Sequence, residues 1–174
     1  MARYGFTFTL ILLAALSRLL PHPANFAPIT ALALFGGVYL DRKHTFIVPI
    51  AAMLISDYFI GFYGGMTWVY ASFIAIGVLG LWVRNRKNIG MIAGATVAGS
   101  MLFFIVTNFG VWISSQVSYA HNLAGLIECY VAAIPFFRNT LMGDAMYVGA
   151  LFGLYELARR LVPELNTRPD AVKL

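Results

Sequence analysis

The chain has 174 residues, of which 60% are hydrophobic and only 11% are charged. Soluble domains carry about 25% charged residues, so this composition excludes an ordinary water-facing surface. The length suits one domain, and the apolar content predicts an all-α membrane protein that crosses the bilayer several times. The single cysteine, Cys129, excludes both an internal disulfide and a CxxC metal site.

Six apolar segments follow one another along the chain, each bounded by proline, glycine, charged or polar residues. They cover residues 4–20, 27–41, 45–63, 66–84, 89–115 and 135–160. A membrane-spanning helix needs about 20 residues. We therefore expect six transmembrane helices in one domain over residues 1–162, followed by a frayed cytoplasmic tail over residues 163–174.

Two of these segments depart from the ordinary length of a span. The second is short, so it is expected either to be tilted less or to begin inside the proline-rich stretch before it. The chain from residue 123 to 161 is helix-compatible throughout, and at about 1.5 Å per residue it is too long for one span. We expect residues 123–134 to form a separate surface or re-entrant helix, broken at Pro135.

The basic residues are divided unevenly between the two sides of this predicted topology. If the N-terminus is cytoplasmic, ten of the twelve Lys and Arg residues fall on the inner side, as the positive-inside rule expects. The exceptions are Arg18 and Arg138. The net charge of +5 then comes from residues that flank helices, which argues against a nucleic-acid partner. We expect a multi-pass protein with both termini in the cytoplasm.

Four ionisable residues are expected at similar depth in the outer half of the bundle. They are Arg18, Asp57, Arg138 and Asp144. Ionisable groups inside a membrane are costly, and they usually pair with one another or face an aqueous cavity. The pattern predicts a polar outer-half cavity, although ion pairs that merely fix helix packing remain an alternative.

Polar and aromatic residues predicted nearby complete the candidate site. The substrate-binding candidates are Arg18, His22, Asn25, Asp57, Asn108, Trp112, Arg138, Asn139 and Asp144. His22, His121 and Asp57 lack the spacing of metal ligands, so we expect no metal. The sequence contains no GxSxG, HExxH or glycine-rich phosphate motif, so we expect neither an enzyme nor a cofactor.

Small residues recur along the second segment, at Ala27, Ala31, Ala33 and Gly37. Small residues at helical spacing let two helix backbones approach closely in lipid. Packing within the chain is the default interpretation. An exposed strip around Ala33 and Gly37 would instead be a contact for a partner protein.

Four stretches carry a resemblance to a known family. "RLLPHPANFAPITALALFGG", "SDYFIGFYGG", "TNFGVW" and "CYVAAIPFFRNTLMGD" resemble an uncharacterised bacterial family of six-helix putative transport proteins. The architecture is in turn similar to the substrate-binding S component of energy-coupling factor (ECF) transporters, small membrane subunits that capture vitamins. In S components a small-xxx-small motif on the first helix contacts the coupling subunit. Here the better candidate, Ala33-xxx-Gly37, is on the second helix.

The resemblance implies a location in the bacterial cytoplasmic (inner) membrane and a substrate cavity closed by outer loops. Arg18 and Arg138 would contact an anionic or carbonyl-rich substrate. Asp57 and Asp144 would orient the arginines or accept hydrogen bonds, while Asn108 and Asn139 would add specificity. The implied partners are the substrate, the lipid bilayer and, unless the protein acts alone, an ECF-type coupling subunit with ATPases.

The function we predict from the sequence is capture of a small polar micronutrient, vitamin-like in character, for import. Two alternatives remain open. One is a non-transporting membrane scaffold subunit of a larger complex. The other is a membrane-embedded enzyme that uses Asp57 or Asp144 as an acid or base.

Overall fold

The computed structural model describes residues 2–86, 88–114 and 119–166. These residues form six α-helices and contain no strand, which confirms the all-α prediction. The helices are α1 (Ala2–Leu16), α2 (Ile29–Tyr39), α3 (His44–Ile60), α4 (Met66–Val83), α5 (Ile89–Ile113) and α6 (Leu123–Leu161). Short 3-10 turns follow three of them, namely η1 (Ser17–Leu19), η2 (Arg84–Arg86) and η3 (Pro163–Asn166).

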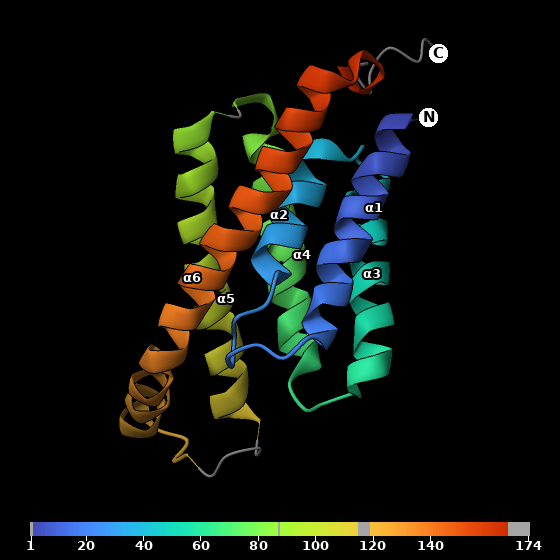
Figure 1. Cartoon of the computed structure of the whole chain (residues 1–174). Coiled ribbons are helices and arrows are strands. Elements are labelled where there is room, and N and C mark those ends of the chain that lie inside the picture. Colours follow the sequence, from blue (N-terminus) through green and yellow to red (C-terminus); the bar gives the residue numbers. More distant parts are fainter. Residues whose placement is uncertain (1, 87, 115–118, 167–174) are drawn as a thin grey trace.

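The helices run up and down in a bundle with two distinct ends (Figure 1). The start of α1, the end of α6 and the turns after α2 and α4 lie at one end, which we call the terminal end. The α1–α2 loop, the α3–α4 turn and the start of α6 lie at the other end, which we call the loop end. Successive helices therefore alternate in direction.

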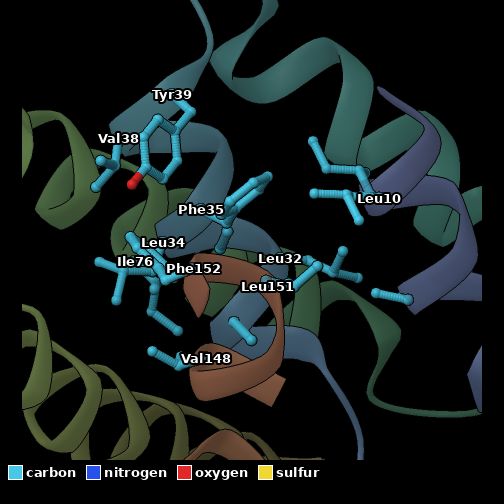
Figure 2. Close-up of a cluster of buried hydrophobic side chains, with 14 of the residues drawn as sticks. Leu10, Leu32, Leu34, Phe35, Val38, Tyr39, Ile76, Val148, Leu151 and Phe152 are labelled. Atoms are coloured by element: carbon cyan, nitrogen blue, oxygen red, sulfur yellow. The ribbon is translucent and has the colours of Figure 1, made fainter. Parts of the chain in front are cut away.

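The short helix α2 forms the centre of the bundle. Ten of its eleven residues are buried, and its side chains pack against α1, α4 and α6. Figure 2 shows Phe35 of α2 beside Phe152 of α6, with Ile76 of α4 close to Leu34. The rings of Phe35 and Phe152 are in edge-to-face contact, with centroids 5.3 Å apart. This contact geometry is favoured because the edge of one ring is positive and the face of the other negative.

The surface of the bundle is rich in large apolar side chains. Exposed examples occur on five helices, including Leu13, Ile55, Val78, Ile105 and Leu154. Two described segments are long and apolar enough to cross a membrane, Met66–Arg86 and Ile89–Ile113. The helices α2 and α3 are apolar but shorter. The six spans predicted from the sequence are therefore not shown by the helices themselves.

The last helix differs from its prediction. Residues 123–134 are expected from the sequence to form a separate helix, but they are the first part of α6, and Pro135 lies inside this helix. The whole of α6 has 39 residues and is about 58 Å long. A proline removes one backbone hydrogen bond and bends a helix without necessarily ending it. In Figure 1 the first turns of α6 accordingly run in a different direction from the rest.

The beginning of the predicted frayed tail is also ordered. Pro163–Asn166 forms η3, which contacts both α1 and α6. The side chain of Leu165 is buried there, so the apolar contact holds this turn against the bundle. The rest of the predicted tail, from residue 167 onwards, falls outside the described residues.

Candidate functional site

A cavity of about 270 Å³ lies at the loop end of the bundle. Residues of η1, the loop after it, the α3–α4 turn and the helices α2 to α6 bound it. The lining residues are Arg18, His22, Asn25, Ala27, Ile29, Thr30, Ile60, Tyr63, Val69, Phe103, Thr140 and Asp144. Apolar walls with a few buried polar groups are typical of small-molecule sites, although this cavity is slightly below their usual range of about 300–1,000 Å³.

Arg18 and Asp57 form a buried ion pair on one side of the cavity. Arg18 is 8% exposed and Asp57 is fully buried, and their Nη2 and Oδ1 atoms are 2.7 Å apart. Arg18 also donates to the hydroxyl of Ser56, while Tyr70 donates to Oδ2 of Asp57 at 2.7 Å. The hydrogen bonds offset the cost of removing both charges from water, and the pair as a whole is neutral.

Asp144 is a second buried acid, 1% exposed, and it lines the cavity from α6. The Ser100 hydroxyl lies 2.6 Å from Oδ2 of Asp144, and the Thr30 side chain lies beside the same carboxyl group and lines the cavity with it. Thr140 lies one turn earlier on α6 and lines the cavity with it. Among the described residues, Asp144 has no Lys, Arg or His within ion-pair distance.

The loop between η1 and α2 forms one wall of the cavity. Asn139 of α6 donates to the Ala24 carbonyl at 3.0 Å, and Phe26 packs against Gly143, whose small size admits the ring. Asn25 adopts a positive φ of 61°, a conformation that asparagine tolerates better than most residues. His22 and Asn25 are exposed and line the cavity from this loop.

The structure brings five of the nine predicted site residues together. Arg18, His22, Asn25 and Asp144 line the cavity, and Asp57 pairs with Arg18. The other four do not line it. Asn108 donates to the Phe104 carbonyl of its own helix, Trp112 donates to the Ala120 carbonyl in the following loop, and Asn139 holds the first loop as described above.

Arg138 is the clearest departure from the predicted site. It is exposed, and within the described residues it forms no ion pair with either acid. Helical geometry explains this, because six residues at 3.6 per turn place Arg138 and Asp144 on different faces of α6. Arg138 instead shares the outward face with Met142, four residues on, which is also exposed.

The predicted partner contact at Ala33 and Gly37 is an internal contact. Both residues are buried inside the bundle. A Cβ atom added to Gly37 would lie 2.6 Å from backbone atoms of Gly77 and Gly80 on α4. The small residues therefore permit close packing of α2 on α4, and they present no surface to a second protein.

The nine predicted site residues include none of the hydroxyl groups of the site. Thr30, Ser56, Tyr63, Tyr70, Ser100 and Thr140 either line the cavity or bond its charged residues. One signal was available, because Thr140 precedes Asp144 by one helical turn and so shares its face. The hydroxyls on other helices could be found only from the packing.

The described residues contain no group of three or more His, Cys, Asp or Glu that could hold a metal ion. Cys129 is buried, and its sulfur lies 3.4 Å from the Asn108 carbonyl oxygen. This contact joins α6 to α5 away from the cavity.

Comparison with known proteins places the chain in one family. A family model described as a family of unknown function, DUF6580, matches residues 1–165. Because the match covers nearly the whole chain, the protein belongs to this family. No curated protein and no solved structure matches the chain.

Proposed function

We propose that this protein is a multi-pass membrane protein that captures a small polar molecule in the loop-end cavity for import. The observation that carries the proposal is a cavity lined by two buried charged residues, Arg18 and Asp144. The loop between η1 and α2 forms one wall of this cavity and is hydrogen-bonded to α6. Buried charged groups are costly to maintain and are common at functional sites.

The apolar surface supports the membrane setting of this proposal. Large exposed apolar side chains occur on α1, α3, α4, α5 and α6, and lipid is the solvent that such a surface favours. Within the proposal all six helices cross the bilayer. The central helix α2 is shielded from lipid by its neighbours, and the residues before it complete that crossing.

The charge distribution supports an orientation in the bacterial inner membrane. The described elements and turns at the terminal end carry Arg3, Arg42, Lys43, Arg84, Arg86, Arg159 and Arg160. By the positive-inside rule this end, with both termini, belongs in the cytoplasm. The cavity then opens to the outside, as the similarity to ECF S components implies.

The similarity to S components leaves the coupling mechanism as a question for experiment. In those proteins a small-xxx-small motif on the first helix contacts the coupling subunit, whereas here Ala33 and Gly37 are on α2 and are buried. The proposal is therefore for substrate capture, followed by import either alone or with an ATPase module. It assigns no catalytic residue.

Native mass spectrometry of the chain, extracted gently from its host's membranes, tests the proposal. We expect a small molecule bound at one copy per chain. Thr140→Phe places a ring in the cavity and should abolish this adduct, whereas Met142→Phe, on the exposed face of the same helix, should keep it. An empty wild-type chain that carries stable protein partners would contradict capture and favour the scaffold function.

Import is tested separately from capture. Cells that express the wild-type chain should deplete the identified molecule from their medium faster than cells that express Thr140→Phe. Co-purified ATPase subunits would indicate a coupled complex. A bound molecule whose depletion is the same in both strains would contradict import while leaving capture intact.

A further inference from the structure

The charges around the cavity do not balance. Arg18 is already neutralised by Asp57, at 2.7 Å, and Arg138 is on the exposed face of α6. Asp144 is the remaining buried charge-bearing group among the residues that line the cavity; the Ser100 hydroxyl is bonded to it, and the Thr30 hydroxyl lies beside it. The expectation of an anionic or carbonyl-rich substrate placed both Arg18 and Arg138 at the cavity, but Arg138 does not line it and Arg18 is paired with Asp57.

The first turn of α2 compensates Asp144 only in part. Thr30 belongs to this turn, so the carboxyl group lies near the positive end of the helix dipole. That end is equivalent to about +0.5 elementary charge. A carboxylate therefore leaves roughly half a negative charge at the cavity wall, in a place where burial makes charge costly.

We propose that the cavity binds a cationic ligand, a small organic amine in its protonated form, with Asp144 as its counter-ion. This inference rests on the proposed function. A carboxylate has about four acceptor sites, and the Ser100 hydroxyl uses one of them at Oδ2, so Asp144 can also accept from an ammonium group. Thr140 and Asn25 add neutral hydrogen-bonding groups around the same space, while Ile29 and Phe103 contact the apolar part of the ligand.

The competing arrangement is a neutral Asp144 with a neutral ligand. A protonated carboxyl group would donate to Ser100, whose own hydrogen would then go to the Thr96 carbonyl, 2.9 Å from its oxygen. Asparagine has the shape of that neutral acid and can donate the same bond. Asp144→Asn therefore separates a required negative charge from a required hydrogen bond.

The test compares the wild-type chain with Asp144→Asn and Glu128→Gln, all extracted from host membranes. Glu128 is an exposed acid near the start of α6, so its variant removes one negative charge outside the cavity. The bound molecule is released and identified by its accurate mass. Reductive methylation with labelled formaldehyde then shows whether it contains an amine, because an amine gains labelled methyl groups. We expect an amine on the wild-type chain and on Glu128→Gln. Occupancy of Asp144→Asn should fall by roughly tenfold or more, as loss of a charged hydrogen bond implies.

The outcomes distinguish this inference from the proposed function. An acidic or uncharged ligand, displaced by Thr140→Phe, would overturn the inference and leave capture standing. An amine held equally by Asp144→Asn would also overturn it, because the counter-ion would lie elsewhere. A wild-type chain that carries no small molecule would overturn both. If Asp144→Asn does not fold, the chemical class of the wild-type ligand still decides the question.

Discussion

The two ends of α2 are stabilised in opposite ways. At its carbonyl end, Arg84 donates to the carbonyl of Gly37 at 2.8 and 3.0 Å and also to that of Leu40. Arg3 donates to the Tyr39 carbonyl at 3.1 Å. At the amide end, the N-cap residue Pro28 makes no side-chain capping hydrogen bond, and the first turn lines the cavity together with Asp144.

The difference shows that one short helix gives the bundle two unlike ends. The terminal end is closed by side chains and is called the closed end below, and the loop end contains the cavity and is called the open end. Cations satisfy the unpaired carbonyl groups and the negative dipole at one end. At the other end the unpaired amides are left beside a cavity and a carboxyl group. Arginine is structural at both ends, because Arg18 is also held by an internal partner.

The largest expected effect comes from breaking the ion pair at the open end. Arg18→Ala leaves Asp57 buried without its cation, and should lower the free energy of unfolding by about 3–5 kcal/mol. The double variant Arg18→Met, Asp57→Leu removes both charges and should recover most of that loss. Thermal or SDS-induced unfolding in detergent measures both. Equal losses in the single and double variants would show that the pair is not the source of the effect.

At the closed end, Arg84→Ala removes the charged donor from the Gly37 and Leu40 carbonyls. Hydrogen bonds to charged groups contribute about 1.5–3 kcal/mol each, so we expect a loss of about 3 kcal/mol. Arg86→Ala, an exposed residue of the same turn, should change stability by less than about 0.5 kcal/mol. The same unfolding assay applies, and equal effects of the two variants would contradict a capping role for Arg84.

Gly37→Ala tests the contact that fixes the closed end against α4. The new methyl group would lie 2.6 Å from the Gly77 carbonyl oxygen, so the backbones must separate. We expect a loss of about 2 kcal/mol, within the usual range for overpacking. Gly94→Ala is the matched control, because no atom lies within 4 Å of its added Cβ and alanine favours helix. A stable Gly37→Ala protein would show that the α2–α4 contact can relax.

Asn139→Ala releases the first loop at the open end. The lost bond to the Ala24 carbonyl spans 3.0 Å and is exposed, so the stability loss should be only about 1 kcal/mol. Hydrogen exchange of residues 20–28 should increase more than that of α3. Unchanged exchange in this loop would mean that Phe26 alone holds it on α6.

The smallest expected effect concerns pH at the closed end. Partial burial raises the pKa of Asp41, but hydrogen bonds from the His44 backbone and imidazole outweigh it and hold this pKa below its ordinary value. A lowered pKa gives stability that is present above pH 4 and is lost as the pH falls further. The stability difference between wild type and Asp41→Asn should therefore shrink between pH 5 and pH 3. A difference that is constant with pH would contradict this linkage.

Much of the fold follows from local patterns in the sequence. The apolar segments between charged turns predicted helices close to α1, α3, α4 and α5, and the alternation of helix direction followed from the basic turns. The continuity of α6 was not predicted, because a proline rule describes an average cost and packing can offset it. The ordered η3 depended on burial of Leu165 against the bundle, a contact between distant parts of the chain.

The candidate site was predictable only as far as charge and depth determine it. Arg18, Asp57 and Asp144 were identified because ionisable residues are rare in apolar segments. Arg138 was misplaced because depth was considered without rotation about the helix axis. Ser100 and Thr30 could not be found from the sequence, since small hydroxyl residues are common in apolar helices and only the packing of α2, α5 and α6 brings these two to Asp144.

Because α2 is so short, its place in the bundle depends on segments that are synthesised after it. Eleven residues cover about 16 Å, roughly half the thickness of the hydrocarbon core. The groove that receives Gly37 belongs to α4, and the arginine that closes its carbonyl end belongs to η2. α2 therefore reaches its final surroundings only after α4 and η2 have left the ribosome. The cavity at its amide end is completed later still, when α6 contributes Thr140 and Asp144.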